Sequence, residues 1–225
     1  MNKFLVLLCA FIYVTGFAAN VTGKANFGGA APKRAPIKMN ADPKCAKLNT
    51  GKQILNDTVI VNSNKTLENV FVYVKEGVKN PPAAPSTAVT FNQQGCMYHP
   101  AVVALRVGQP LKILNSDDTM HNVHSLSKVN PGFNNAMPTK GQTIEKKFGK
   151  PETMIRVKCD VHTWMNAYIN VLEHPYYAVT DSSGAYTIKD LPDGEYTIEA
   201  VHGKLGAKTV KLKVAGGAAT QDFSF

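Results

Sequence analysis

Two short segments of the sequence carry side chains typical of a site for a soft metal ion. Residues 159–165 place the thiol of Cys159, the imidazole of His162 and the thioether of Met165 at three-residue steps on one tight loop. A thiolate and two imidazoles in a plane, with a distant thioether above it, form the ligand set of a type I copper centre. One loop supplies only one imidazole, so the second must come from the end of another strand. His121 is the candidate.

Two other uses of these side chains are less favoured. His124 is three residues from His121, so on a strand it points to the opposite face, and we expect a packed or surface histidine there. Cys159 and His162 could in principle form a nucleophilic pair. Their three-residue spacing beside Met165 argues against that, and one type I site offers a substrate no second metal. We therefore expect that the protein is not an enzyme.

The elements that must position these residues are short strands. Alternating or β-branched runs separated by Gly, Pro, Asn and Asp recur along the chain, and no segment shows a convincing helical period. This pattern predicts an all-β protein built from β-sandwiches. Breaks at residues 80–85 and 174–175 divide it into residues 52–80, 86–174 and 175–225.

The middle piece resembles the cupredoxin family, and within it the amicyanin and plastocyanin-like blue copper proteins. The resemblance rests on His-Asn-Val-His at 121–124, Met137-Pro138 before a glycine turn, and the seven-residue loop 159–165. It implies a Greek-key β-sandwich over residues 86–174 that binds one type I copper. The ligands that it implies are His121, Cys159, His162 and Met165. It also implies that the Asn122 side chain ties the two ligand loops together.

The loop departs from that family, which often has prolines between the Cys and the Met. This chain has none there, and Asp160 stands beside the thiol. The resemblance implies that His162 lies at the surface, where its exposed edge is the exit for the electron. Trp164 and Met137-Pro138 either surround that edge as an apolar docking patch, or Trp164 only covers the copper from water. The sequence leaves both open.

The C-terminal piece resembles the carboxypeptidase regulatory-like, transthyretin-like β-sandwich family. The matching residues are Asp181, Gly184, Tyr186, Ile188, Leu191, Pro192, Gly194 and Tyr196. Because fifty residues make a poor core alone, and that family opens with strands like those at 58–77, we expect a discontinuous module. It would comprise residues 52–80 and 175–225, with the copper domain inserted. The alternative is that the early strands extend the copper domain's own sheet.

The first residues are typical of an export signal. Lys3 precedes an apolar run that ends at small residues, which predicts a signal peptide over 1–18. The run is shorter than the ~20 apolar residues of a spanning helix, so no stable membrane insertion is expected after its removal. The Ala, Gly, Pro and Lys content of residues 19–42 predicts a flexible linker. Export predicts a periplasmic, secreted or cell-surface protein.

Removal of the signal leaves three cysteines, of which two should pair in an oxidising compartment. We expect a disulfide between Cys45 and Cys96, with Cys159 left for the metal. A second metal site that uses these two thiols with His99 is a less favoured alternative.

Charge and composition limit the range of possible functions. Lys and Arg total 25 against 16 Asp and Glu, a net charge of +9, but no run of five basic residues occurs. We therefore expect no nucleic-acid binding, and redox protein partners with an acidic surface. The favoured function is an exported one-electron carrier between such partners. The alternative is a periplasmic copper-binding or delivery protein, which the scattered methionines argue against.

Overall fold

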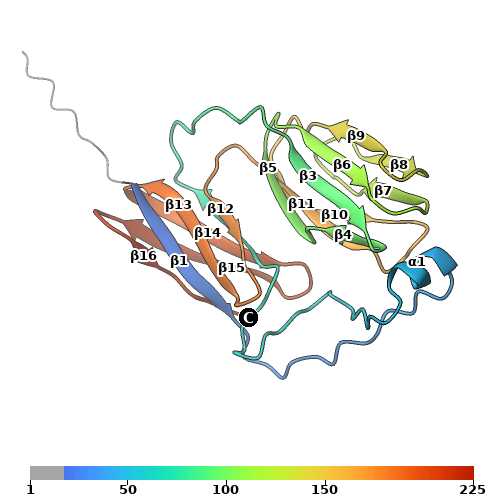
Figure 1. The fold of residues 1–225 in the computed structure, drawn as a ribbon. Helices are drawn as coiled ribbons and strands as arrows, with labels where there is room; N and C mark the ends of the chain where they lie inside the picture. The colour runs from blue at the N-terminus through green and yellow to red at the C-terminus, as the bar shows by residue number, and fades with distance from the viewer. Residues whose placement is uncertain (1–17) are drawn as a thin grey trace, which may run out of the picture.

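The computed structural model describes residues 18–225, so most of the predicted signal peptide lies outside the described residues. The described chain is almost entirely β, as predicted, and forms two modules that lie side by side (Figure 1). Within this part of the chain the only α-helix is α1 (Pro43–Leu48), and no helix there is long and apolar enough to span a bilayer.

The first module is a sandwich of two sheets. One sheet has the order β5-β11-β10-β7-β8 and the other β4-β3-β6-β9. The strands of the first sheet are β5 (Val102–Arg106), β11 (Asn166–Leu172), β10 (Glu152–Lys158), β7 (His121–Ser125) and β8 (Phe133–Met137). Those of the second are β4 (Met97–His99), β3 (Val89–Gln94), β6 (Leu111–Asn115) and β9 (Thr143–Lys146).

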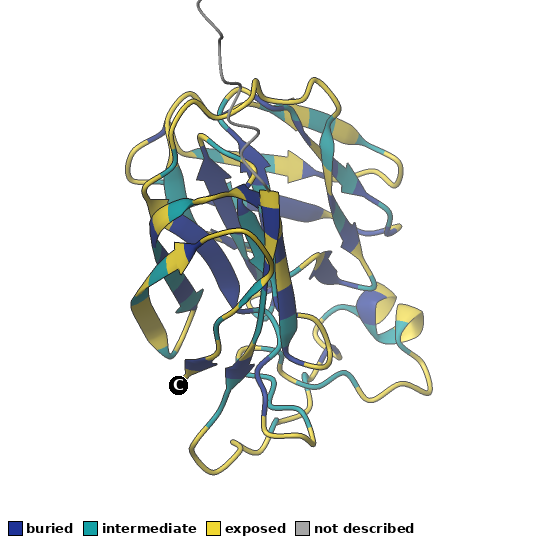
Figure 2. Ribbon diagram, turned by 90° about the vertical axis from the view of Figure 1, so that its left-hand side faces the viewer, coloured by how far each residue is buried: buried dark blue, intermediate teal, exposed yellow. Residues whose placement is uncertain are grey.

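Alternation along these strands builds the core between the two sheets. In β6, Leu111 and Ile113 are fully buried while Lys112 between them is exposed. Such a period of two directs one side of each strand to the core. Figure 2 shows the buried residues gathered on the strands and the exposed ones on the connecting loops.

The second module also has two sheets. One has the order β12-β2-β14-β15, and in the other β1 lies between β13 and β16 and also pairs with β17. The strands of the first are β12 (Tyr177–Val179), β2 (Phe71–Glu76), β14 (Gly194–His202) and β15 (Gly206–Val214). Those of the second are β13 (Ala185–Pro192), β1 (Ala18–Asn26), β16 (Ala219–Thr220) and β17 (Phe223–Ser224). Because β2 pairs with β12 and β14, a segment that precedes the first module shares a sheet with segments that follow it.

The expectation of a flexible linker over 19–42 is wrong for its first part. Residues 18–26 form β1, which runs antiparallel to β13 and parallel to β16 and β17. The physical reason is burial, because Val21 and Ala25 are fully buried in the core of the second module. Small and polar residues between them obscure this alternation in the sequence.

The chain between β1 and β2 leaves the second module and returns to it. In Figure 1 it runs from the end of β1 along the lower edge of the molecule to α1, and then back. Met39 and Cys45 belong to the first module's core, and Ile37 and Ile54 pack against it. The predicted start of the second module at residue 52 is therefore too early, since Val59 is the first residue of this return segment that packs on the second core.

The two modules pack together through a small apolar cluster. Phe71 and Tyr73 of β2 are buried with Val102 of β5 and Leu172 of β11. Arg106, also in β5, donates from Nη2 to the carbonyl oxygens of Pro82, between β2 and β3, and Glu173, between β11 and β12. These contacts hold the two sandwiches in one arrangement.

Candidate metal centre

The structure brings His121, Cys159 and His162 together at one end of the first module. One ligand atom from each lies within 4.8 Å of the others, and all three residues are buried. The two Nδ1 atoms are 2.9 Å apart, and Cys159 Sγ lies 3.9 Å from His162 Nδ1. Met165 is fully buried in the same core. Its N–H donates to the His162 carbonyl and its carbonyl accepts from the Cys159 N–H, which closes the loop 159–165.

Strand pairing explains why these distant segments meet. β10 runs antiparallel to β7, with Val157 opposite Ser125 and Lys158 opposite His124. Cys159 follows directly after β10, so the ligand loop begins beside the start of β7. There His121 is the first residue and turns inward with 0% exposure.

Asn122 connects the two ligand segments. Its Oδ1 accepts from the Asp160 N–H at 2.7 Å and from the Cys159 thiol at 3.2 Å. Its Nδ2 donates to Asn134 and Asp160. The side chain therefore fixes the sulfur relative to β7, the role that the resemblance implies for it.

Each imidazole is also held on its far side by a carboxylate. His121 Nε2 lies 3.0 Å from Asp117 Oδ2, and His162 Nε2 lies 2.8 Å from Asp42 Oδ2. A carboxylate at one ring nitrogen fixes the tautomer and leaves the other nitrogen, here Nδ1, free to face a metal. Neither aspartate was predicted. Asp117 is four residues before His121, but nothing local in the sequence points to Asp42.

The electrostatics of the site favour a thiolate. Burial alone would raise the pKa of Cys159, but hydrogen bonds with the side chains of His121 and His162 and with the backbone of Asn122 lower it to about 6. Burial alone would lower the pKa of His121, but Asp117 and Cys159 raise it to about 9. Since the thiolate is the form that binds metals, the site holds its sulfur in the state that a soft ion needs.

His162 is not at the surface as expected. Its side chain is only 2% exposed, because a segment from the other end of the chain covers it. Asp42 contacts its Nε2, Cys45 Sγ lies 3.5 Å from the same atom, and the Trp164 ring lies 5.0 Å away between centroids. The expectation that electrons leave through an exposed edge of His162 is therefore wrong for this chain.

The expected docking patch changes too. Met137 is fully buried, and its Sδ accepts from Gln93 Nε2 at 3.0 Å, so it offers no surface to a partner. Trp164 is half-buried against His162, and its Nε1 donates to the Cys96 carbonyl. It therefore covers one side of His162.

His124 lies away from the three converging residues. Its Nδ1 is 3.0 Å from Asp160 Oδ2, and Lys158 Nζ contacts the same carboxylate at 2.8 Å. The hydrogen bond from Lys158, together with those from Asn134 and His124, holds the pKa of Asp160 well below its usual range. This group forms an exposed network beside the ligand loop.

The predicted disulfide between Cys45 and Cys96 is confirmed, with Cα atoms 5.7 Å apart, and Cys159 is the free cysteine of the described chain. Two further clusters, Asp42 with Cys45 and His162, and Cys96 with Asp117 and His121, share sulfur atoms of that disulfide. A disulfide sulfur carries no thiolate charge, so these clusters do not form a second thiolate site. His99 belongs to none of the clusters found among residues 18–225.

The donor set fits copper. Two imidazole nitrogens and one sulfur of buried residues converge, with a thioether in the same core. Imidazole, thiolate and thioether together are the ligands of blue-copper electron-transfer sites. The hydrogen bonds of Asp42, Asp117 and Asn122 supply the outer support that such ligands need.

Comparison with known proteins finds partial similarities of fold. No family model matches the chain, and no curated protein is significantly similar in sequence. Among solved structures, the chain resembles a copper-containing nitrite reductase from Thermus scotoductus SA-01, with 22% identity and a TM-score of 0.36 over 42% of this chain and 25% of that one. It resembles a purple cupredoxin from Nitrosopumilus maritimus, with 19% identity and a TM-score of 0.32 over 36% of this chain and 97% of that one.

A third similarity is to an oxidised mutant of amicyanin, with 21% identity and a TM-score of 0.34 over 44% of this chain and 97% of that one. The chain thus spans a quarter of the length of the nitrite reductase and nearly all of the two smaller proteins. Similarities this distant assign neither a family nor an activity, so the function has to be argued from the site itself.

Proposed function

We propose that this protein binds one copper ion through His121, Cys159, His162 and Met165 and carries single electrons between redox proteins outside the cytoplasm. The observation that supports this most is the convergence of Nδ1, Nδ1 and Sγ of three buried residues within 4.8 Å of one another. A catalytic role is less well supported, because no second cluster of free ligands adjoins the site among the described residues.

Copper in this site would supply a one-electron couple between Cu(I) and Cu(II). The part of the chain is to keep the ligands still as the charge changes. Asp117 and Asp42 hold the imidazoles by their Nε2 atoms, and Asn122 holds the loop beside Cys159 by accepting from the Asp160 N–H. Burial keeps water from the ligands, and a fixed arrangement of ligands limits the reorganisation that a change in charge demands.

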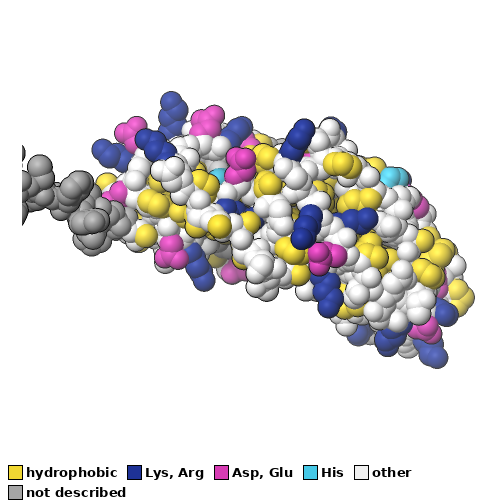
Figure 3. All heavy atoms as spheres, turned by 90° about the horizontal axis from the view of Figure 1, so that it is seen from above, with side chains coloured by type: hydrophobic (Ala, Val, Ile, Leu, Met, Phe, Trp, Pro, Cys, Tyr) yellow, Lys and Arg dark blue, Asp and Glu magenta, His cyan; other side chains and the backbone are white. Residues whose placement is uncertain are grey.

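The partners in this proposal are redox proteins with an acidic surface, because the chain carries a net charge of +9. On the face in Figure 3, Lys and Arg side chains are interspersed with Asp and Glu rather than gathered in one patch. That distribution supports long-range attraction of an acidic partner more than a dedicated basic docking site. The proposal also includes an exported, periplasmic or cell-surface location.

The test is addition of one equivalent of Cu(II) to the metal-free protein, followed by absorption spectroscopy and voltammetry. We expect an intense sulfur-to-copper band and a reversible one-electron wave. His121→Ala should abolish the band. The matched control is His124→Ala, which removes a nearby imidazole whose Nδ1 lies 3.0 Å from Oδ2 of exposed Asp160, and it should leave the band unchanged.

The same experiment separates the alternative function. A colourless ion that a chelator removes within seconds would favour copper binding and delivery over electron transfer. Equal loss of the band in both histidine variants would contradict the ligand assignment.

A further inference from the structure

The imidazole of His162 is covered by a segment of the chain that precedes both its own module and β2. We call residues 39–49 the cap segment; it contains α1 and both residues that touch His162 Nε2, Asp42 and Cys45. The sequence separation between Asp42 and His162 is 120 residues. The cover is therefore built by the path of the chain and not by the ligand loop.

Asp42 uses its two carboxylate oxygens for different tasks. Oδ1 accepts from the N–H groups of Lys44 and Cys45, which caps the N-terminus of α1. Oδ2 accepts from Thr119 Oγ1 at 3.0 Å and lies 2.8 Å from His162 Nε2. The helix cap thus aims a charged oxygen at the ligand.

The disulfide fastens the cap segment to the hairpin between β3 and β4. Cys96 lies in that turn, where Gly95 and Cys96 both have positive φ, as a tight hairpin turn requires. Asp117 accepts from the N–H groups of both turn residues and also holds His121. The Cys45–Cys96 bond therefore links the carboxylate on one imidazole to the carboxylate on the other.

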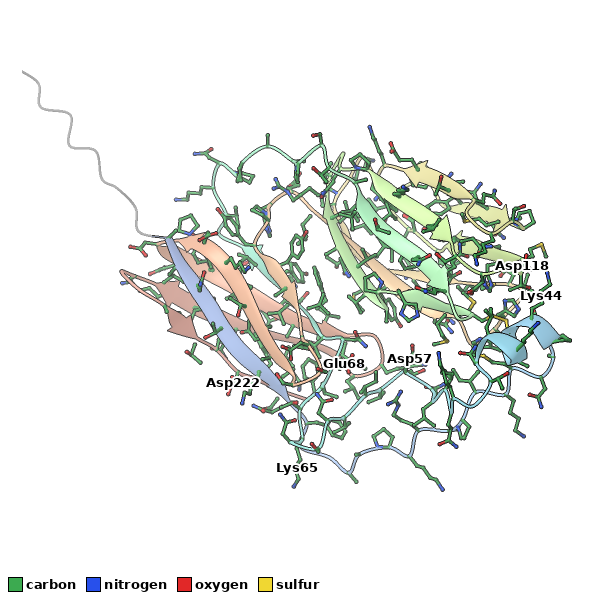
Figure 4. All side chains as sticks on the ribbon, in the orientation of Figure 1. Lys44, Asp57, Lys65, Glu68, Asp118 and Asp222 are labelled. Carbon is green, nitrogen blue, oxygen red and sulfur yellow. A yellow bond between two sulfur atoms is a disulfide. The ribbon has the colours of Figure 1, made fainter. Side chains whose placement is uncertain are left out.

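A weaker contact joins the cap segment to the loop before His121. Lys44 and Asp118 form an ion pair of 3.6 Å, and Figure 4 shows the two side chains together where α1 meets the ligand end of the first module. Both side chains are largely exposed, at 59% and 82%, and an exposed pair of this kind contributes little to stability. This pair therefore serves as a control at the same edge.

We propose that Asp42 is a positioning residue for His162, and that the cap segment, held by the Cys45–Cys96 disulfide, closes the metal site against solvent and small reagents. The metal that it would protect is the one under "Proposed function", on which this inference rests. The closure itself is a property of the chain and exists whether or not an ion is bound.

The test measures access to Cys159, which is the free cysteine of the described residues and is 1% exposed. Its rate of alkylation by iodoacetamide is measured in the folded, metal-free, unreduced protein. Asp42→Ser keeps an oxygen to cap the helix but shortens the reach to His162. Asp42→Asn keeps the length and an acceptor but removes the charge. Asp118→Asn is the matched control.

We expect Asp42→Ser to raise the alkylation rate about tenfold, because one charge-assisted hydrogen bond that holds the cap is lost. Asp42→Asn should raise it about twofold, and Asp118→Asn should leave it unchanged. The double variant Cys45→Ser/Cys96→Ser should raise it by more than Asp42→Ser. Circular dichroism verifies that each variant is folded. If the double variant does not fold, Asp42→Ser still tests the proposal, because it retains the disulfide.

An Asp42→Ser protein that is folded and alkylated at the wild-type rate would overturn the inference. A second readout is the Cu(II) electron paramagnetic resonance spectrum, which Asp42→Ser should alter and Asp118→Asn should not. Alkylation needs no copper, so a failure of the proposed function leaves the closure testable. A normal copper spectrum in Asp42→Ser would refute the positioning role and leave the proposed function intact.

Discussion

The two modules of this protein use their interiors in different ways. Of the fifteen buried polar or charged residues in the described chain, twelve lie in the first module and only Thr66, Thr180 and His202 in the second. In the second module they serve the backbone: Thr180, for example, donates to the Leu67 carbonyl and accepts from the Val70 N–H. In the first module Asp117, His121 and His162 converge at one end of the sandwich.

A buried polar group costs stability unless it is hydrogen-bonded, so a cluster of such groups needs a purpose. In the first module Asp117 and Asp42 hydrogen-bond to the two imidazoles, and Asn122 accepts from the N–H of Asp160. The second module has an apolar core and no comparable cluster among its described residues. The first sandwich therefore accommodates buried polar groups that bond to one another, whereas the second is stabilised by the burial of apolar side chains.

The largest effect should come from removing the sulfur. Cys159→Ser should weaken Cu(II) binding by at least about 100-fold and abolish any sulfur-to-copper band, because oxygen does not replace a soft thiolate. The free energy of unfolding of the metal-free variant should lie within about 1 kcal/mol of the wild-type value, since a hydroxyl fits the same space and can hydrogen-bond to Asn122. Copper titration and urea unfolding measure the two quantities. An unchanged affinity would place the metal elsewhere.

The next effect is a loss of stability without a change in the site. Ile198→Ala in β14 removes a fully buried side chain from the second core and should lower the unfolding free energy by about 2–5 kcal/mol. Its copper spectrum should be unchanged. Ile169→Ala in β11 is the counterpart in the first core and should cost a similar amount. A spectral change in the Ile198 variant would break the division of roles between the modules.

A smaller effect should follow from exposing one side of His162. Trp164→Ala removes a ring that lies 5.0 Å from the imidazole. If the ring is part of the contact with a redox partner, Trp164→Ala should slow electron transfer to that partner several-fold and leave the sulfur-to-copper band in place. Stopped-flow mixing with a partner, alongside the static spectrum, measures both. Loss of the band together with the rate would show that the ring only covers the site.

The smallest effect concerns Glu152, far from the ligands in β10. Burial alone would raise its pKa, but bonds from the Lys128 N–H, Ser127 and Asn130 lower it from 4.5 to about 2. Because the pKa is lower in the folded state, this stabilisation is complete above about pH 4.5 and is lost as the pH falls towards 2. Because the side chain is partly exposed, solvent screening reduces its contribution to the free energy of unfolding to about 1 kcal/mol.

Unfolding of wild type and Glu152→Gln across this range checks the sign. The gap in unfolding free energy should be largest above about pH 5 and should narrow towards about pH 2. A gap that widens on acidification would contradict the assignment.

The sequence predicts those features of the fold and the candidate site that depend on residues close together along the chain or on a known motif. The spacing of Cys159, His162 and Met165 is short enough for one loop to impose their proximity. His121 followed from the need for a second imidazole at another strand end. The all-β fold followed from alternation, which is itself a local property.

The features that the sequence does not predict depend on contacts between residues that are far apart along the chain. Asp42 meets His162 only because residues 27–57 cross from one module to the other and back, and no local pattern encodes that crossing. The burial of His162 has the same cause. The sequence predicts a linker in place of strand β1 because the buried residues Val21 and Ala25 are separated by a stretch that contains Gly23 and Lys24, two residues of low strand propensity.

X-ray absorption at the copper edge of the Cu(II)-loaded protein would show directly whether one ion binds between the sulfur of Cys159 and the two Nδ1 atoms. We expect one short copper–sulfur distance together with two imidazole nitrogens at about 2.0 Å, and loss of the sulfur shell in Cys159→Ser. A spectrum with nitrogen and oxygen neighbours alone, unchanged in that variant, would contradict that expectation.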